Sequence, residues 1–342
     1  MKHLLPPVTY YKAALHVHST VSDGKLTPQE ARDAYKAKGY SILALTDHSV
    51  MVQHQDLNLP DFLMITGSEV DTDDRWAPDG NVRKRQCHLC LLSKDPMRQW
   101  VPFQDPYPIP TSVPYQALNE DGGCSREYSP ENLNKVIAEC NRNGMLVTYN
   151  HPVWSLERYP DYSPLKGLWG MEYRNSSCVA HGYDENNGWV YQDFCVQGNR
   201  MVPVCADDMH NPVHRTNGYP VLGEGFVMIG AEKLEYDAVF AAMEKGDLYA
   251  SCGPQINSLT LEGDSLHITC SKAARIQLVS HTRCVSMAHD EQNGITEATF
   301  DIARWRKFAV HAEHAFLRLI VTDATGRYAV TRAYFADELT EE

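Results

Sequence analysis

The first two-thirds of the chain alternates short, continuously apolar segments with helix signals, and this pattern restricts the fold to the α/β class. The apolar segments lie at residues 13–18, 40–45, 62–65, 89–92, 145–149, 168–173, 201–205 and 225–229. Strands that are apolar throughout are typical of a parallel sheet that is buried on both faces. With about seven such units in the sequence, we expect a closed or nearly closed α/β barrel.

The segments between these strands begin and end as helices do. Thr27 as N-cap, Pro28 and Glu30 form a capping box, and Gly39 follows the end of the same helix. Similar signals predict helices over residues 129–144 and 236–245.

The pattern changes after Gly246. Short, often alternating segments follow, and turn signals such as Asn293-Gly294 separate them. They lie at residues 249–250, 256–261, 266–270, 275–280, 296–301, 315–322 and 327–334. This spacing predicts a small antiparallel β-sandwich. We therefore expect two domains, residues 1–248 and residues 249–342, with the boundary near residues 246–255.

Charge and histidine content narrow the classes of function. Lys and Arg number 31 against 44 Asp and Glu, and the net charge of −13 disfavours attraction to long nucleic acid or an anionic membrane. The 15 histidines offer many ligands for a divalent metal. No apolar run approaches the roughly 20 residues of a membrane span, and no secretory signal is apparent. We therefore expect a cytoplasmic protein whose ten cysteines are reduced.

One stretch fits neither pattern. Six prolines lie between residues 96 and 114, a density that neither a helix nor a central strand tolerates. We expect a long, stiff loop there. It could be a lid over an active site, a contact for a partner or an insertion without a function.

Histidine and carboxylate side chains follow the predicted strands near their ends. They are His16, His18, Asp23, His48, Glu69, His88, His151, Asp208 and His210. The carboxyl ends of barrel strands meet at one mouth, so side chains from separate strands converge there. Residues i and i+2 of an extended strand point the same way, so His16 and His18 can chelate one ion, and Asp208 and His210 repeat this spacing. Nitrogen and carboxylate ligands of this kind suit Zn, Mn or Fe.

The order of these motifs resembles that of the PHP (polymerase and histidinol phosphatase) superfamily over about residues 10–246. The motifs that carry the resemblance are His16-Val17-His18-Ser19 to Ser22-Asp23-Gly24, Thr46-Asp47-His48, Glu69, His88, Asn150-His151-Pro152 and Asp208-Met209-His210. The resemblance implies a distorted (β/α)7 barrel that holds two or three divalent ions and hydrolyses phosphate esters. The junction at residues 246–254 is similar to that of two-domain bacterial PHP proteins.

The same resemblance implies sets of metal ligands. The first ion would take His16, His18, Glu69 and Asp208; the second would share Glu69 and add His88 and His151; a third would take Asp23, His48 and His210. Asp23 stands where some relatives carry His, so occupancy of the third site stays open. Asp208 is preferred to Asp207 because the family pattern is Asp-x-His. Asp207 would then point away from the ions, and Asp207 and Asp47 would act by orienting ligands.

These features predict a hydrolase for a small phosphomonoester or phosphodiester. A hydroxide that bridges two ions would attack phosphorus in line. His210 or Asp23, if not bound to metal, could protonate the leaving alkoxide. Arg174 and Arg215, with Asn175, are candidates to bind the substrate because they follow strand ends, and His181 and His214 lie close enough to the expected mouth to contact it.

Two other functions fit parts of the sequence. A metal-dependent amidohydrolase would use the same hydroxide to attack a carbonyl carbon. A non-catalytic binding module would keep a degenerate metal site and use its β-sandwich to contact a glycan or a partner. The complete set of candidate ligands argues against this second alternative.

Overall fold

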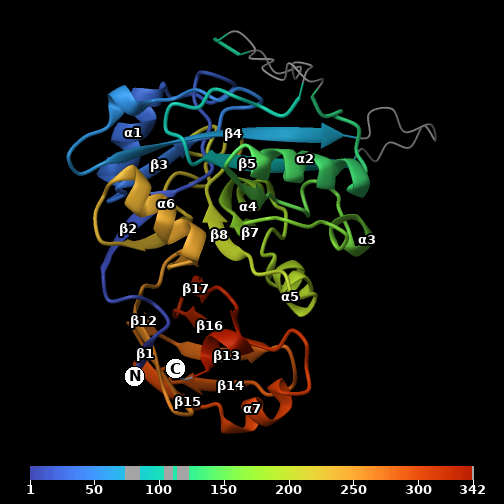
Figure 1. The fold of residues 1–342 in the computed structure, drawn as a ribbon. Helices are drawn as coiled ribbons and strands as arrows, with labels where there is room; N and C mark the ends of the chain where they lie inside the picture. Colours follow the sequence, from blue (N-terminus) through green and yellow to red (C-terminus); the bar gives the residue numbers. More distant parts are fainter. Residues whose placement is uncertain (74–84, 104–110, 114–122, 341–342) are drawn as a thin grey trace.

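A computed structural model describes residues 1–73, 85–103, 111–113 and 123–340. It shows a mixed α/β protein with one large sheet and a second, antiparallel sheet (Figure 1). Neighbours in the first part of the large sheet follow the order of the chain. These strands are β2 (Thr9–Ala14), β3 (Ile42–Leu45), β4 (Leu63–Asp73), β5 (Gln86–Ser93), β6 (Met145–Tyr149), β7 (Gly170–Asn175) and β8 (Val202–Ala206). On its other edge β2 pairs with β9 (Phe226–Ala231).

The expectation of a parallel sheet is wrong for two strands, β5 and β9. The pairs β2–β3, β3–β4, β6–β7 and β7–β8 are parallel, whereas β5 runs antiparallel to both β4 and β6, and β9 runs antiparallel to β2. A continuous apolar segment reports that a strand is buried on both faces, and burial does not depend on the direction of the strand. The reversal of β5 has a functional consequence, because it brings the start of β5 beside the far end of β4.

The three predicted helices, α1, α2 and α6, begin where the sequence signals place them. The Thr27 hydroxyl accepts a hydrogen bond from the Glu30 amide, and the Glu30 carboxylate accepts one from the Thr27 amide, so the predicted capping box opens α1. Helical segments are α1 (Pro28–Ala37), α2 (Pro130–Arg142), α3 (Tyr159–Tyr162), α4 (Ser176–His181), α5 (Gly188–Val196), α6 (Tyr236–Lys245) and α7 (Ala303–Ala309), with short 3-10 turns at Gln55–Leu57 and Ala336–Leu339. The buried face of α2 packs Leu133, Val136 and Ile137 into the core that Val147 and Tyr149 of β6 also enter.

The two ends of this strand order meet beyond β2 and β8. The Asp208 amide donates to the His16 carbonyl oxygen at 3.0 Å, and the His18 amide donates to the Met209 carbonyl oxygen at 3.1 Å. Within the described residues no ladder pairs β8 with β9, so the closed (β/α)7 barrel stays a prediction.

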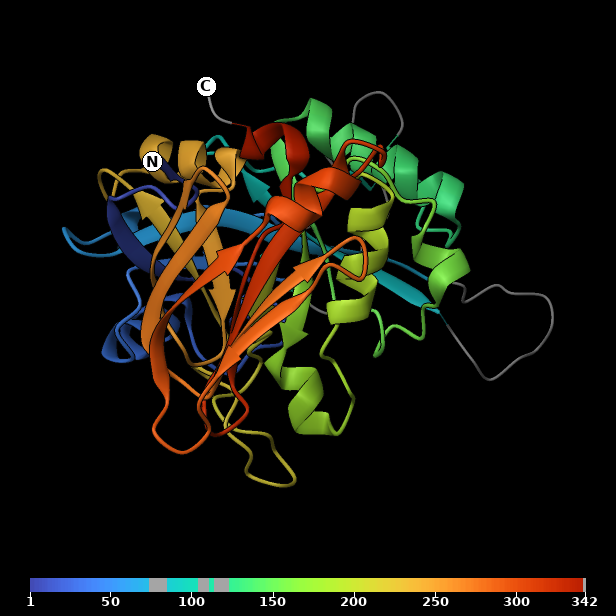
Figure 2. The ribbon, with the colours of Figure 1, turned by 90° about the horizontal axis from the view of Figure 1, so that it is seen from below.

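The β-rich C-terminal region forms two antiparallel layers (Figure 2). One layer has the order β1-β11-β12-β15, and the other continues the large sheet through β9-β10-β17-β16-β13-β14, with β18 paired to β16. The strands are β1 (Lys2–His3), β10 (Leu248–Ser251), β11 (Ile256–Glu262), β12 (Ser265–Ala273), β13 (Arg275–Ser280), β14 (Ser286–His289), β15 (Ile295–Asp301), β16 (Phe316–Thr322), β17 (Tyr328–Thr331) and β18 (Tyr334–Phe335). An apolar core that includes Leu259, Ile268, Phe300 and Val321 fills the space between the layers.

The two-domain division at residue 248 stays a prediction, and two contacts cross it. Strand β10 pairs with β9 on one side and with β17 on the other, so hydrogen bonds connect the two regions along one sheet. At the start of the chain, Lys2 and His3 pair with Leu261 and Thr260 of β11, so β1 belongs to the C-terminal layer.

Some predictions concern parts that the model describes only partly. Of the Pro-rich loop, residues 104–110 and 114 lie outside the described residues, while Trp100, Val101 and Phe103 are buried. The ten cysteines are all free thiols, and most are buried. Among the described helices, none combines the length and the apolar character needed to cross a membrane.

Candidate metal centre

The structure brings all nine predicted ligands into one cluster, although they come from separate segments. Glu69 lies within β4, and the antiparallel β5 places His88 opposite Asp71, two residues beyond Glu69. The other members follow β2, β3, β6 and β8. They are His16, His18, Asp23, His48, His151, Asp208 and His210.

Glu69 is the centre of this cluster. Its buried carboxylate is shared by five histidine rings. The nitrogen to oxygen distances are 3.2 Å for His16 Nε2, 3.4 Å for His18 Nε2, 3.3 Å for His48 Nδ1, 3.1 Å for His88 Nδ1 and 3.2 Å for His151 Nε2. A carboxylate with two oxygens directed at five ring nitrogens is suited to bridging two cations.

Asp208 is the second shared carboxylate. Its Oδ1 lies 3.3 Å from His16 Nε2, 3.2 Å from His18 Nε2 and 3.5 Å from His210 Nδ1. The sequence argument expected Asp208 and His210 to share a face of an extended strand, and this geometry is wrong. Strand β8 ends at Ala206, and Asp208 has a φ of 51°, in the left-handed region. His151 also has a positive φ, of 22°. Such conformations are strained in non-glycine residues and concentrate at functional sites.

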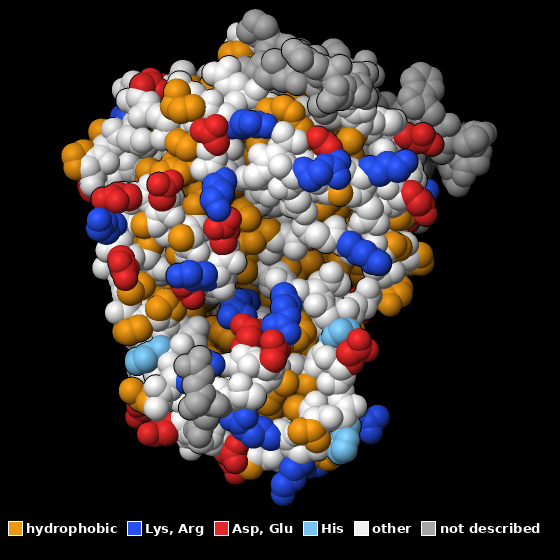
Figure 3. All heavy atoms as spheres, in the orientation of Figure 1, with side chains coloured by type: hydrophobic (Ala, Val, Ile, Leu, Met, Phe, Trp, Pro, Cys, Tyr) orange, Lys and Arg blue, Asp and Glu red, His pale blue; other side chains and the backbone are white. Residues whose placement is uncertain are grey.

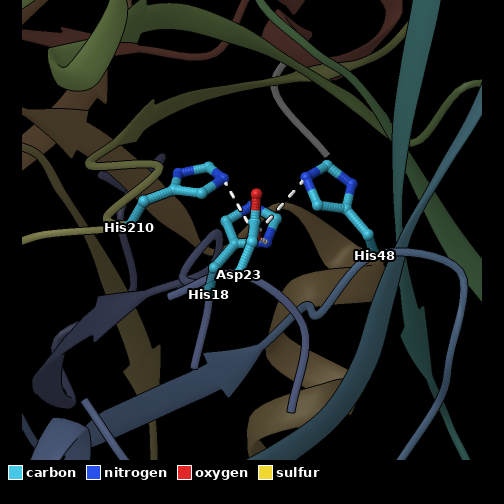
Figure 4. Close-up of side chains that lie close together, drawn as sticks. All are labelled: His18, Asp23, His48 and His210. Atoms are coloured by element: carbon cyan, nitrogen blue, oxygen red, sulfur yellow. Dashed lines mark ion pairs between the residues drawn. The ribbon is translucent and has the colours of Figure 1, made fainter. Parts of the chain in front are cut away.

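A third group lies nearer the surface. Figure 4 shows His48 and His210 on either side of Asp23, with His18 beside them. Asp23 Oδ1 is 3.4 Å from His210 Nε2 and 3.9 Å from both His18 Nδ1 and His48 Nε2. The side chains of Asp23 and His210 are the most exposed of the cluster, at 37% and 30%. Any molecule that enters from solvent therefore meets them first.

The donor atoms form three groups that overlap at several residues, whereas the sets implied by the family resemblance share only Glu69. The groups are His16, His18 and Glu69; His48, Glu69 and His88; and His18, Asp23, His48 and His210, and within each the donor atoms lie within 4.8 Å of one another. His18, His48 and Glu69 therefore belong to two groups each.

The chemistry of this donor set fits divalent cations. Among the described residues, buried ring nitrogens of the cluster that lack a hydrogen-bond partner include His18 Nδ1 and His88 Nε2. Burial would raise the pKa of Glu69, but the neighbouring His16 and His88 outweigh it and hold this pKa well below its usual value. Burial would lower the pKa of His18, but hydrogen bonds with Asp208 and Glu69 outweigh it and raise the pKa to about 10. Buried, ionised carboxylates thus gather positive charge around them, which protons or metal ions can supply.

Residues behind the ligands fix their orientation. The Glu172 carboxylate lies 2.6 Å from His16 Nδ1 and also accepts hydrogen bonds from the His151 amide and from Asn175 Nδ2. Asn175 Nδ2 lies 3.2 Å from Asp208 Oδ2 as well, so Asn175 contacts a ligand from behind rather than lining the cavity. Asn150 Nδ2 donates to Glu69 Oε1 at 3.0 Å. The sequence argument assigned no such role to Glu172 or Asn150, although a glutamate inside an apolar strand was a usable signal.

The two aspartates expected to orient ligands differ in their contacts. Asp47 accepts hydrogen bonds from the amides and hydroxyls of Ser19 and Ser22, and so holds the loop that joins His18 to Asp23. Asp207 points away from the cluster. It accepts hydrogen bonds from the Tyr35 hydroxyl and from the amides of residues 223–225, so it anchors the loop before β9.

A cavity of about 700 Å³ opens onto the cluster. Asp23, His48, Glu69, His88, His151, Asp208 and His210 form its floor, and Trp154, His181, His214, Arg215 and Thr216 are among the residues of its walls. The structure does not bring Arg174 here, because Arg174 donates to Asn186 Oδ1 and is absent from the lining residues. Trp154, which the sequence argument missed, contacts the rings of His88 and His151 with centroid distances of 5.2 and 5.0 Å.

Comparison with known families agrees with the motif reading. Residues 14–96 match the PHP domain family, which confirms the resemblance to the PHP superfamily. This region contains His16, His18, Asp23, His48, Glu69 and His88. Among curated proteins, none matches the chain.

Three of the solved structures that match this chain share little sequence with it. A two-domain protein from Bacteroides vulgatus, described as containing a PHP-like metal-dependent phosphoesterase, is 14% identical, with 98% of each chain covered and a TM-score of 0.42. A protein from Bifidobacterium adolescentis described as a metal-dependent phosphoesterase is 13% identical, with 61% of this chain and 92% of that chain covered and a TM-score of 0.35. An amidohydrolase from Chromobacterium violaceum, with bound sulfate and no metal, is 16% identical, with 58% and 88% covered and a TM-score of 0.37.

Proposed function

We propose that this chain, whose residues 14–96 match the PHP domain, is a metal-dependent hydrolase that cleaves a small phosphate ester. The observation that carries the proposal is the Glu69 carboxylate, which five histidine rings share at the floor of an open cavity. Two divalent ions bound there, Zn, Mn or Fe by ligand type, would polarise a phosphoryl oxygen and make a water molecule nucleophilic at neutral pH.

The chain's own residues would supply the remaining steps. Glu172 holds the His16 ring through Nδ1 and leaves Nε2 directed at Glu69 and Asp208. His210 and Asp23, at the exposed side of the cluster, are placed to hold a third ion or to give a proton to the leaving oxygen. A side chain that is bound to a metal ion cannot give a proton at the same time, so each of these two residues would have one role or the other.

Arg215, His181 and His214 are candidates to bind the phosphate end of the substrate, because all three line the cavity above the cluster. The His181 ring lies edge-on to the His214 ring at 4.3 Å between centroids. His181 Nδ1 donates to the Ser177 carbonyl oxygen, which leaves Nε2 available to a ligand. Arg174 is not part of this proposal, since it lies outside the cavity.

The size and charge of the molecule favour a small substrate over long nucleic acid. Figure 3 shows Lys and Arg interspersed with Asp and Glu on one face, without a continuous basic stripe. The net charge of −13 acts in the same direction. We also propose that the protein acts in the cytoplasm, since the free thiols of its ten cysteines suit a reducing compartment.

The decisive experiment measures metal content and hydrolysis together. The purified protein is analysed for bound metals and assayed against phosphomonoesters, phosphodiesters and amides, each with added Mn or Zn. We expect two or three ions per chain and release of phosphate or of an alcohol from an ester. His16→Ala and Glu69→Ala should each abolish turnover and lower metal content, whereas His267→Ala, on a surface strand, should change neither.

Each other outcome has a defined meaning. Full activity in His16→Ala or Glu69→Ala would overturn the metal assignment. Hydrolysis of amides without hydrolysis of any ester would replace the phosphoesterase by an amidohydrolase. Fewer than one ion per chain with no hydrolysis would favour a binding module.

A further inference from the structure

A second cavity, of about 590 Å³, lies between α5 and the C-terminal strands β13 and β16. Helix α5 is beside these strands in both ribbon views (Figures 1 and 2). We call this second cavity the α5 cleft. It is separate from the metal centre, because the lining residues of the two cavities do not overlap. Its chemistry differs from the rest of an acidic molecule, since it is lined by Arg275, His281 and Arg318 and, among the described residues, by no Asp or Glu.

Arg318 is the deepest of these basic groups, with only 5% of its surface exposed. Among the described residues it pairs with no carboxylate. Its guanidinium donates to Gln192 Oε1 through Nε and Nη2, at 3.4 and 3.3 Å, and to the Tyr173 hydroxyl through Nη1, at 3.2 Å. A guanidinium has five N–H groups, so two remain beyond these three contacts. A buried charge without a counter-ion is costly, and an anion in the cleft would offset this cost.

His281 supplies a further donor. Its Nδ1 accepts from Trp305 Nε1 and from the Phe316 amide, both at 3.4 Å, so the ring proton lies on Nε2. Within the described part of the chain, His281 Nε2 is buried and has no hydrogen-bond partner. Arg275, at one end of β13, is half-buried and lines the same cleft.

The rim of the cleft is aromatic. Trp189, on α5, lines the cleft and leaves 82% of its surface exposed. An indole ring at the edge of a basic cleft can cover a flat apolar group. The side-chain amides of Gln192 and Gln277 also line the cleft.

We propose that the α5 cleft binds a small organic anion, with a phosphate or carboxylate group held between Arg318 and Arg275 and a flat apolar part against Trp189, while His281 offers a further donor at the other end of β13. The inference does not depend on the proposed hydrolase activity, because none of these residues belongs to the metal centre.

The test uses the full chain and follows the fluorescence of Trp189, taken as the difference between the natural protein and Trp189→Phe. The probes are inorganic phosphate, phenylphosphonate and benzoate. None is a phosphate ester, so none can be hydrolysed at the metal centre. We expect a saturable change with phenylphosphonate or benzoate that is tighter than with inorganic phosphate. Binding of phosphate and phenylphosphonate alone identifies a phosphate group, and binding of benzoate alone identifies a carboxylate.

Matched variants decide whether the cleft is responsible. Arg275→Ala should weaken binding by about tenfold or more, because charge-assisted hydrogen bonds are lost. Arg283→Ala removes the same charge from the exposed loop after β13, outside the cleft, and should bind as the natural protein does. Arg318→Met should abolish binding if circular dichroism shows that it folds, and Arg275→Ala decides the question if it does not. The proposal is overturned if no probe gives a saturable change up to about 10 mM, or if Arg275→Ala and Arg283→Ala behave alike.

Discussion

At the scale of single residues, the metal centre is arranged around buried carboxylates. Glu69 and Asp208 face histidine nitrogens, and Glu172 supports His16 from the opposite side. A carboxylate behind a histidine fixes the tautomer of the ring and directs its second nitrogen at the metal. The metal affinity should therefore depend on residues that never touch the metal.

Glu172→Gln tests this dependence. The amide keeps the size of the side chain but removes the charge that holds His16 Nδ1–H, so we expect metal affinity to fall by about 10- to 100-fold. Calorimetric titration of the protein with Zn or Mn measures it. Glu157→Gln is the matched control, a buried carboxylate that contacts Tyr128 and Tyr149 instead of a ligand. Equal affinities in both variants would contradict a positioning role for Glu172.

A second prediction at this scale concerns pH and stability. Burial raises the pKa of Glu157 from 4.5 to about 8, and the Tyr149 and Tyr128 hydroxyls only partly oppose this. A raised pKa means that the folded state binds the proton more tightly than the unfolded state does. Its contribution to stability is complete below about pH 4.5 and is lost as the pH rises through about 8.

We therefore expect the melting temperature to decline between about pH 5 and pH 8.5, and Glu157→Gln to decline less. Thermal unfolding followed by circular dichroism across this range measures both. Glu291→Gln, on an exposed turn, is the control and should follow the natural protein. Identical pH profiles for Glu157→Gln and the natural protein would contradict a contribution of Glu157 to the pH dependence of stability.

At the scale of elements, the direction of strand β5 decides whether His88 can join the cluster. If β5 ran parallel to β4, His88, near its start, would lie at the opposite edge of the sheet. Because β5 is antiparallel, His88 reaches the same edge as residues that follow β3 and β6. The loop of residues 19–24 after β2 is a second such element, and it brings Asp23 to the cluster.

Gly24 makes that loop possible. A Cβ at this position would lie 2.4 Å from the His18 carbonyl oxygen. This contact is too short, and because the oxygen belongs to the backbone, the loop itself would have to move to relieve it. We expect Gly24→Ala to displace Asp23 from His48 and His210 and to lower the metal content by the ion of the third group, with the fold retained. Elemental analysis and circular dichroism measure the two effects. Lys25→Ala changes the next residue, which is exposed, and this control should keep the full metal content. Full metal content in Gly24→Ala would contradict a role for the loop.

The sequence allowed much of this to be predicted, and the exceptions have physical reasons. His16, His48 and His151 could be found because each follows an apolar segment, and such segments end at the edge of a buried sheet. The direction of β5 could not be predicted, because its apolar pattern shows only that the strand is buried and is the same for either direction. The turn at Asp208 could not be found either, because nothing in the local sequence demands a positive φ there. The role of Glu172 depends on partners that lie far away along the chain, after β2 and after β6.

At the scale of the whole molecule, one sheet extends from the region of the candidate metal centre into the C-terminal region. Strand β10 pairs with β9 and with β17, so the two regions share a ladder rather than a flexible linker. Residues from the start of the chain complete the opposite layer through the pairing of β1 with β11. Neither the pairing of β10 with its two neighbours nor that of β1 with β11 can be predicted from sequence periodicity. Periodicity indicates which face of a strand is buried, whereas tertiary contacts decide which strand lies beside it.

A chain that lacks residues 2–5 tests the contribution of β1. Leu4 and Leu5 are 7% and 3% exposed and lie in the core between the two C-terminal layers. Their loss should leave a cavity and an open strand edge, so we expect faster amide hydrogen exchange in β11 and β12 with unchanged metal content. His3→Ala, which removes only an exposed side chain, should exchange as the natural protein does. Unchanged exchange in the truncated chain would contradict this role.

The pairing of β1 with β11 also affects the order of events during synthesis. Lys2 and His3 are synthesised more than 250 residues before their partners Leu261 and Thr260. Leu4 and Leu5 therefore stay exposed while the segments of the metal centre are being made. A nascent chain must keep these leucines away from other apolar surfaces until β11 is made, and a chaperone could bind them during that interval.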